Sequence, residues 1–160
     1  FGRVKALIDH LGKRITKADL QYIVETVLKA MSEAAPVLQV KDFQVTTFLK
    51  GQAEAKVWIL LDGEEVQSAA TGVGPVDAVV MALQRAAESR HKLFFALVDY
   101  QVEINTPGTD ASVETTITMQ DADRNRVVAT GTSPDIIVAS VQAFVEGYNM
   151  LWARQRPASR

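Results

Sequence analysis

One order of sequence patterns occurs twice between residues 41 and 151, and this internal repeat limits the possible folds more than any other feature. In each copy, three segments of alternating apolar and polar residues precede one helical pattern. The letters repeat as well. Residues 70–75 (Ala-Thr-Gly-Val-Gly-Pro) match residues 129–134 (Ala-Thr-Gly-Thr-Ser-Pro) 59 positions later, and Asp62 matches Asp121 at the same spacing. Agreement in letters, periodicity and element order indicates two related units.

Alternation with a period of two predicts the strands of both units, and a period near four predicts their helices. The first unit is predicted to have strands over 41–47, 55–61 and 66–70, a hairpin turn at Asp62-Gly63, and a helix over 76–89. The second is predicted to have strands over 96–104, 113–119 and 127–130, a turn over 121–125, and a closing helix over 134–151.

Neither set of three strands can cover its apolar face alone. We therefore expect an α+β fold in which two βββα units face each other across a pseudo-twofold axis, with the helices packed against the sheets. An apolar edge left over from this arrangement would favour a dimer.

The first part of the chain is predicted to be helical. Apolar residues at spacings of three and four predict a helix over 4–11, ended by Gly12, and a second helix that begins at Thr16 and carries an apolar stripe. The stripe consists of Leu20, Ile23, Val24, Val27, Leu28 and Met31. Pro36 is expected to close this region, so residues 1–37 form a helical linker or subdomain and residues 38–160 the two-unit domain. Because the chain starts at Phe1, we expect it to be a piece of a longer protein.

Composition excludes several classes of function. The 17 Lys and Arg residues nearly balance the 19 Asp and Glu residues, and no basic stripe is visible, which argues against nucleic acid or an anionic membrane surface as the main partner. The chain has no cysteine, so disulfides, thiolate nucleophiles and cysteine-based zinc sites are excluded. No apolar run approaches the ~20 residues of a membrane-spanning helix. A cytoplasmic location is expected.

The turn at residues 71–75 (Thr-Gly-Val-Gly-Pro) is the most suggestive local motif. Its glycines allow backbone N–H groups to approach a ligand, and Pro75 fits the first position of a helix, whose N-terminus can hold a carboxylate. The second copy, residues 131–135, would add a matching helix N-terminus. A tight strand-to-helix connection explains the same residues without any ligand.

Catalytic constellations are missing from the sequence. The two histidines, His10 and His91, lie far apart and are expected at the surface or at helix ends, and no metalloprotease or serine-hydrolase motif occurs. Trp58, Trp152 and the pair Tyr148-Asn149 are expected to be packing residues. We therefore expect no catalytic residue and no metal site in this chain.

Four motifs in order suggest a family. Residues 72–78 (Gly-Val-Gly-Pro-Val-Asp-Ala), 97–100 (Leu-Val-Asp-Tyr), 108–111 (Gly-Thr-Asp-Ala) and 135–140 (Asp-Ile-Ile-Val-Ala-Ser), followed by Gly147-Tyr-Asn149, resemble the C-terminal regulatory domain of 2-isopropylmalate synthase. Citramalate synthase has a similar domain. The segment before residue 38 resembles the helical linker that follows the catalytic barrel in this family.

The resemblance implies a feedback domain. Members of the family condense acetyl-CoA with a 2-oxo acid on a metal-dependent TIM barrel, and leucine or isoleucine inhibits them by binding the C-terminal domain, which also helps to build the homodimer. The barrel is absent here. The chain is therefore expected to bind an effector and a partner subunit but no cofactor, while the parent enzyme would use a divalent metal and acetyl-CoA.

The resemblance also assigns an effector site. By position in the motifs it would comprise Gly74, Val76, Leu97, Asp99, Tyr100, Ile104, Asp110, Ala111, Thr132 and Ser133. Val76, Leu97 and Ile104 would form an apolar wall, the N–H groups after Gly74 and Ser133 would face the carboxylate, and Asp99 or Asp110 would attract the ammonium group.

The identity of the effector stays open. Leucine is the expected effector, with isoleucine as the alternative, because one methylene changes discrimination by only ~1–3 kcal/mol. A third possibility is a dimerisation module without an effector. If an effector acts on a catalytic barrel, Gly12 and the region of Pro36 are candidate hinges of the linker.

Overall fold

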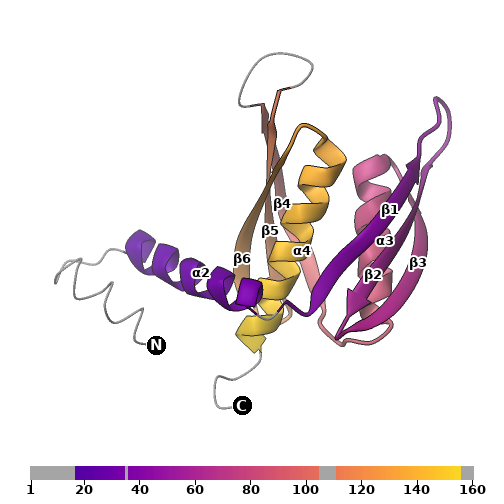
Figure 1. The fold of residues 1–160 in the computed structure, drawn as a ribbon. Coiled ribbons are helices and arrows are strands. Elements are labelled where there is room, and N and C mark those ends of the chain that lie inside the picture. Colours follow the sequence, from indigo (N-terminus) through magenta and orange to yellow (C-terminus); the bar gives the residue numbers. More distant parts are fainter. Residues whose placement is uncertain (1–16, 35, 105–110, 156–160) are drawn as a thin grey trace.

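The computed structural model describes residues 17–34, 36–104 and 111–155 of the chain (Figure 1). Its elements are α2 (Lys17–Ala34), β1 (Leu38–Thr46), β2 (Ala53–Leu61), β3 (Glu64–Gly72), α3 (Pro75–Glu88), β4 (Phe95–Ile104), β5 (Val113–Asp121), β6 (Arg126–Ser133) and α4 (Ile136–Gln155). The predicted α+β fold of two βββα units behind a helix is confirmed. The predicted helix over 4–11 and the helix start at Thr16 lie outside the described residues.

The first sheet is antiparallel in the order β1-β2-β3. Its central strand, β2, alternates as predicted, and Val57, Ile59 and Leu61 are fully buried. The predicted hairpin turn is also confirmed. Asp62 and Gly63 both have positive φ, 55° and 80°, as a type I′ turn requires, so Asp-Gly suits these positions.

The second sheet repeats this design in the order β4-β5-β6. Thr115, Ile117 and Met119 of its central strand β5 are fully buried. In both sheets the first strand carries an irregularity near its start, between Val40 and Asp42 in β1 and between Leu97 and Asp99 in β4. The two units therefore share a local defect as well as an element order, which supports the internal repeat.

Each helix covers the apolar face of its own sheet, and the two helices meet in the middle of the molecule (Figure 1). α3 packs on β2 and β3, and α4 packs on β5 and β6. The buried apolar residues of both units form a single cluster. α4 is long and apolar enough to cross a membrane, but ten of its residues are buried in this core, which accounts for its composition.

α2 packs against α4 and otherwise projects from the body (Figure 1). Ile23 and Leu28 of the predicted stripe are buried, and Lys29 lies 3.5 Å from Glu146 of α4. Leu20 and Met31 of the same stripe are 48% and 42% exposed. The stripe therefore packs over only part of its length.

Glycine allows each helix to approach its sheet closely. A Cβ on Gly72 would lie 2.4 Å from the backbone nitrogen of Ala78, and one on Gly131 would lie 2.0 Å from the carbonyl oxygen of Ala139. Gly72 is the last residue of β3, and Gly131 lies two residues before the end of β6. The Thr-Gly pair that both units share thus reflects a packing requirement where the third strand leads into the helix.

Two predicted element starts are wrong. β1 begins at Leu38 rather than near residue 41, because its first residues pair with the end of β2. α4 begins at Ile136 rather than Pro134, because Asp135 closes the first helical bond, from the Ala139 N–H. The equivalent bond in α3 runs from Ala78 to Gly74, so the helix starts are 61 residues apart (74 and 135), not 59. The letter match at the two prolines is therefore displaced by two residues from the structural equivalence.

Candidate functional site

Four of the predicted effector residues of the second unit lie on one face of its sheet, spread along the length of β4. Leu97 lies opposite Met119, Tyr100 opposite Ile117, and Ile104 opposite Val113, which itself lies opposite Ser133 on β6. Directly paired residues share a sheet face, and here it is the face that α4 covers over β5 and β6. Leu97, Tyr100, Ile104 and Ser133 are therefore brought to one side of the sheet.

The edge strand β4 extends beyond the cover that α4 provides. Tyr100, Val102 and Ile104 are 40%, 38% and 67% exposed, although all three point to the apolar face; we call these three residues the β4 ledge. The Tyr100 hydroxyl lies 2.9 Å from the Ser140 hydroxyl, which donates to the Ile136 carbonyl at 2.8 Å. Tyr100 thus fixes the ledge to the first turns of α4.

The carboxylates expected to attract an ammonium group do not join the ledge. Asp99 lies opposite Thr118, on the other face of the sheet, and accepts a hydrogen bond from Gln101 at 2.9 Å. The irregularity between Leu97 and Asp99 places these two residues on opposite faces of the sheet. Asp110 lies outside the described residues. Ala111, at 9% exposure, is buried beside the same end of β5, and Thr132 is exposed.

The two helix N-termini differ, contrary to the expected matched pair. Asp135 accepts hydrogen bonds from the N–H groups of Ile137 (2.7 Å) and Val138 (3.3 Å), and its own N–H donates to Ser133 Oγ (3.1 Å). The start of α4 is therefore occupied by its own carboxylate. α3 has Gly74 as its N-cap residue and therefore no side-chain cap for the N–H groups of its first turn, which includes Val76.

Asp77 limits what the start of α3 can hold. Its Oδ2 accepts the Val73 N–H at 2.9 Å, which places a negative charge in the first helical turn. Such a charge suits the helix dipole and competes with a ligand carboxylate. Gly74 and Val76 are half-buried, and Val76 packs on the core.

His91 lies just beyond the end of α3, where its N–H donates to the Ala87 carbonyl, so the expected helix-end position is confirmed, but the residue is buried rather than at the surface. It is 7% exposed, its Nε2 lies 2.6 Å from Asp62 Oδ2, and its Nδ1 lies 2.8 Å from the Tyr148 hydroxyl. Burial, and second the negative charge of Asp62, raise the pKa of Tyr148 far above its ordinary value, so the phenol keeps its proton. Trp152 stacks on the His91 ring with centroids 4.0 Å apart.

Asn149 is a second buried polar residue whose role the sequence did not reveal. Its Oδ1 accepts the N–H groups of Val37 (2.9 Å) and Leu38 (2.8 Å), and its Nδ2 donates to the Leu38 carbonyl (2.9 Å). The side chain therefore ties the start of β1, just after α2, to α4. Together, Tyr148 and Asn149 join the two units across the middle of the molecule.

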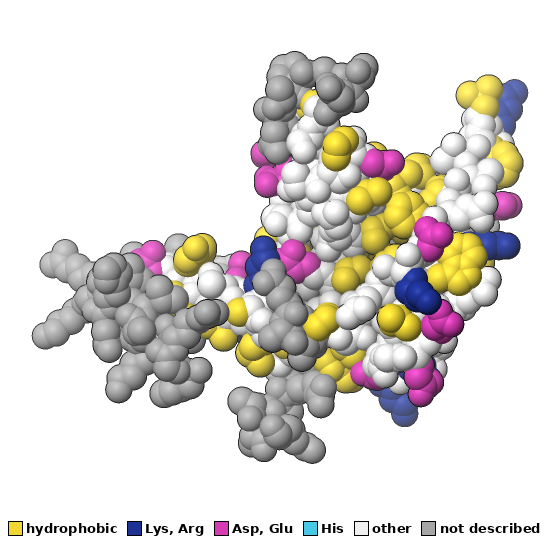
Figure 2. Space-filling model, viewed as in Figure 1, with side chains coloured by type: hydrophobic (Ala, Val, Ile, Leu, Met, Phe, Trp, Pro, Cys, Tyr) yellow, Lys and Arg dark blue, Asp and Glu magenta, His cyan; other side chains and the backbone are white. Residues whose placement is uncertain are grey.

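An apolar groove lies between β1 and α4. Its volume is about 540 Å³, and it is lined mainly by Leu38, Val40, Phe43, Val138, Val141 and Val145. Lys41, Asp42, Gln142 and Glu146 add polar groups. Figure 2 shows hydrophobic side chains gathered between the upper part of α4 and the first sheet, where the surface is hollowed.

Among the described residues, no group of three His, Asp or Glu side chains could hold a metal ion. The polar side-chain clusters in this part of the chain hold the fold together. Asp62, His91 and Tyr148 join the units, and Asp121 closes the β5–β6 turn through Asn125 and Gln155. The arrangement offers apolar surfaces and backbone donors for recognition.

These features define a class: a regulatory or assembly domain of two βββα units with uncovered apolar edges. Comparison with known proteins names the family. Residues 14–152 match the family described as the LeuA allosteric (dimerisation) domain, and the chain belongs to this family.

The relatives are longer proteins. The chain is 41% identical over 155 residues to a putative (R)-citramalate synthase CimA of Methanopyrus kandleri, covering 96% of the chain and 30% of that protein. It is 42% identical over 153 residues to a protein of the same name in Methanosphaerula palustris, covering 96% of the chain and 29% of that protein. A probable 2-isopropylmalate synthase of Methanopyrus kandleri is 42% identical over 154 residues, covering 96% of the chain and 30% of that protein. The chain thus spans about three tenths of the length of these relatives.

Proposed function

We propose that the chain is the feedback domain of an acetyl-CoA-dependent synthase of the 2-isopropylmalate or citramalate type, that it forms a homodimer, and that it binds a branched-chain amino acid. Family membership supports the regulatory role, and the relatives' names support the type of parent enzyme. The divalent metal, acetyl-CoA and condensation belong to the parent's catalytic barrel in this proposal. The domain acts from the cytoplasm by biasing the linker helices.

The observation that carries effector binding is the β4 ledge. Three apolar side chains on the apolar face of β4 stay exposed at the strand end where Ala111, Thr132 and Ser133 also lie. A branched aliphatic side chain is the chemistry that such a ledge would bury. β3 and β6 are antiparallel to the central strands β2 and β5, so they end where the central strands begin. α3 and α4 therefore both start at that end of their sheets (Figure 1). The uncapped N–H groups of α3 are the donors proposed for the ligand carboxylate.

The effector is leucine or isoleucine. Leucine follows from the resemblance to 2-isopropylmalate synthase, and isoleucine from citramalate synthase. The two Methanopyrus relatives are 42% and 41% identical, so overall similarity does not favour either. Thermal-shift titrations with leucine, isoleucine, valine and lysine separate them. A ligand at 100 times its Kd stabilises the fold by about 2.7 kcal/mol, which raises the Tm by several degrees in a domain of this size.

Two matched variants test the site. Ile104 and Phe94 are 67% and 66% exposed and lie at opposite ends of β4. Ile104→Asp should weaken binding of the amino acid at least ~10-fold with little change in the Tm of the free protein, whereas Phe94→Asp should bind as the wild type does. A folded dimer that binds none of the amino acids would support the dimerisation-only module instead.

A further inference from the structure

We propose that the groove between β1 and α4 is the surface through which two copies of this chain pair, and that the tip of the partner's β1–β2 hairpin fills it. This inference rests on the homodimer in the proposed function and assigns the interface to named residues.

The groove is apolar where it is deepest. Val138, Val141 and Val145 project from one face of α4 at spacings of three and four, and Val40 and Phe43 face them from β1. Val141 is 7% exposed, and the other four are partly buried against the core. Its volume of about 540 Å³ lies within the ~300–1,000 Å³ range of pockets that bury an organic group. An open apolar hollow of this kind marks an interaction site.

The hairpin tip supplies an apolar group of matching character. Leu49 is 99% exposed and Phe48 is 51% exposed, so neither is buried effectively in a single chain. Leu49 lies six residues beyond Phe43, and an extended strand of that length spans roughly 20 Å, so the tip projects away from its own groove. Figure 1 shows the hairpin extending beyond the body of the molecule. Only another chain can bring the tip to the groove.

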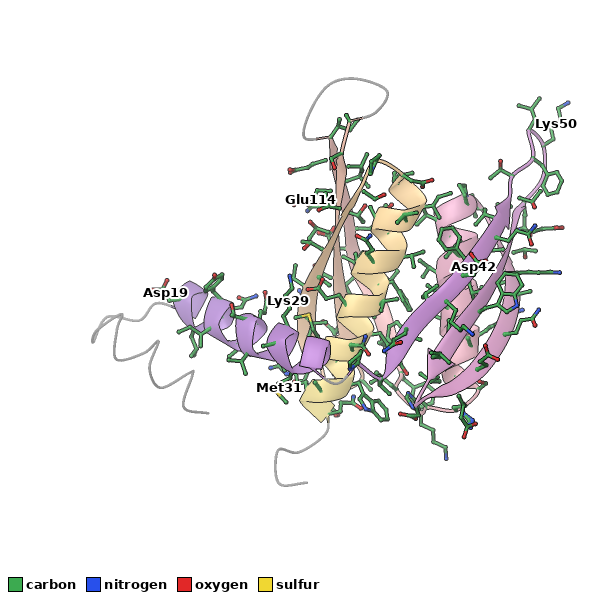
Figure 3. All side chains as sticks on the ribbon, in the orientation of Figure 1. Asp19, Lys29, Met31, Asp42, Lys50 and Glu114 are labelled. Carbon is green, nitrogen blue, oxygen red and sulfur yellow. The ribbon has the colours of Figure 1, made fainter. Side chains whose placement is uncertain are left out.

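Charge complementarity favours a second copy as that other chain. Lys50 follows Leu49 at the tip, and Asp42 lies on β1 at the rim of the groove (Figure 3). The tip and one wall of the groove belong to the same strand, as a self-complementary twofold interface requires. If Lys50 faces the partner's Asp42, then in an antiparallel arrangement Leu49 faces the partner's Phe43, and the twofold axis passes near Thr46. The twofold axis then also places the partner's hairpin tip against the groove of the first chain.

Sedimentation equilibrium of matched variants tests the apolar contact. Leu49→Asp should raise the dimer dissociation constant at least ~30-fold, the effect typical of an interface hot spot, and should leave the Tm of the monomer unchanged because the side chain is exposed. Phe94→Asp, an exposed aromatic away from the hairpin, should leave the dissociation constant within a factor of ~2. A Leu49→Asp dimer as tight as the wild type would overturn the proposal.

Cross-linking tests the geometry, because the chain has no cysteine of its own. Lys50→Cys chains mixed with Asp42→Cys chains should form a covalent heterodimer on mild oxidation, since a disulfide needs Cα atoms within ~7 Å. Lys50→Cys mixed with Phe94→Cys should not.

The outcomes separate the two proposals. A wild-type chain that stays monomeric while binding the amino acid would overturn the interface and leave effector binding standing. A stable dimer in which Lys50→Cys and Asp42→Cys link no faster than the control pair would place the interface elsewhere.

Discussion

At the residue scale, the contacts that decide the arrangement of the two units are buried and polar. Asn149 on α4 and Leu38 on β1 are 111 positions apart in sequence, and His91 and Tyr148 are 57 apart. Sequence patterns predict apolar faces well, because alternation records burial directly. They give no partner for an isolated asparagine or histidine. Asn149 was therefore expected only to pack, and His91 was expected at the surface or at a helix end, with no buried partner.

The Asn149 side chain predicts a large loss of stability on truncation. Asn149→Ala leaves the N–H groups of Val37 and Leu38 and the Leu38 carbonyl without this partner in a buried place. We expect the free energy of unfolding to fall by roughly 2–4 kcal/mol, since each buried group left unpaired costs about 1–3 kcal/mol. Urea denaturation measures the change. Gln142→Ala removes a bond to the exposed Thr132 N–H and serves as the control, with a change below ~1 kcal/mol. Equal changes in both variants would contradict the anchoring role of Asn149.

Glycine at the strand-to-helix corner gives a second residue-scale prediction. A Cβ at position 131 would meet the Ala139 carbonyl oxygen at 2.0 Å and the Ala143 nitrogen at 2.9 Å, and neither backbone atom can move without shifting α4. Gly131→Ala should therefore destabilise the fold by about 2–3 kcal/mol or more. Gly74 has nothing within 4 Å of the same position and an extended backbone (φ −141°), so Gly74→Ala should cost about 1 kcal/mol or less. Thermal unfolding of the two variants should rank them in this order, and the reverse order would show that α4 adapts.

At the scale of elements, the central strands β2 and β5 were predicted best because one face of each is fully buried. The edge strand β4 has a burial pattern that fades along its length, so its predicted role depended on the family resemblance rather than on alternation. The start of α4 was predicted two residues too early, at Pro134, because Pro134 matches Pro75 at the start of α3 in the sequence repeat. The capping by Asp135, which fixes the true start, is visible in the sequence only as an Asp two residues after a Ser.

The β5–β6 turn should respond to acid through Asp121. Burial is the largest single influence on this carboxyl and opposes ionisation, but hydrogen bonds from Asn125, Gln155 and the N–H groups of Asn125 and Asp123 together outweigh it and lower the pKa of Asp121 below its ordinary value. A carboxyl with a lowered pKa in the folded state stabilises the fold above its unfolded pKa of ~3.9, and this contribution is lost as the pH falls through the folded value.

Asp121→Asn tests that contribution. At pH 7 the variant should be about 1–2 kcal/mol less stable than the wild type, because charge-assisted hydrogen bonds become neutral ones. The difference should shrink between about pH 4 and pH 2 as the wild-type carboxyl takes up its proton. Asp123→Asn, at an exposed position in the same turn, controls for the general loss of one negative charge. A difference that is independent of pH would show that shape, not ionisation, holds the turn.

At the scale of the whole molecule, sequence reasoning predicted two units but not how they are joined. The repeat accounts for each sheet and its helix, whereas the joint relies on Tyr148 and Asn149 of α4, which have no similar residues in α3. Gly147, Tyr148 and Asn149 align with Ala86, Ala87 and Glu88 when the helix starts are superposed at a spacing of 61. Of the two helices, only α4 therefore contributes these junction side chains. Its Asn149 meets the chain where α2 passes into β1, so movement of α4 would reach the linker at that point.

This shared helix predicts that the domain unfolds as one unit. The buried residues of both sheets and both helices form one cluster, and α4 contributes to it from Val141 through Leu151. We expect calorimetry to give one transition with equal calorimetric and van't Hoff enthalpies per cooperative unit, and a Tm that rises with chain concentration because the dimer dissociates on unfolding. A fragment covering residues 36–94 should stay largely unfolded, because it lacks the α4 surface that Leu38, Val40 and α3 pack against. Two resolved transitions, or a fragment that folds with the stability of the whole chain, would mean that the units are independent and that Asn149, His91 and Tyr148 connect them without coupling them.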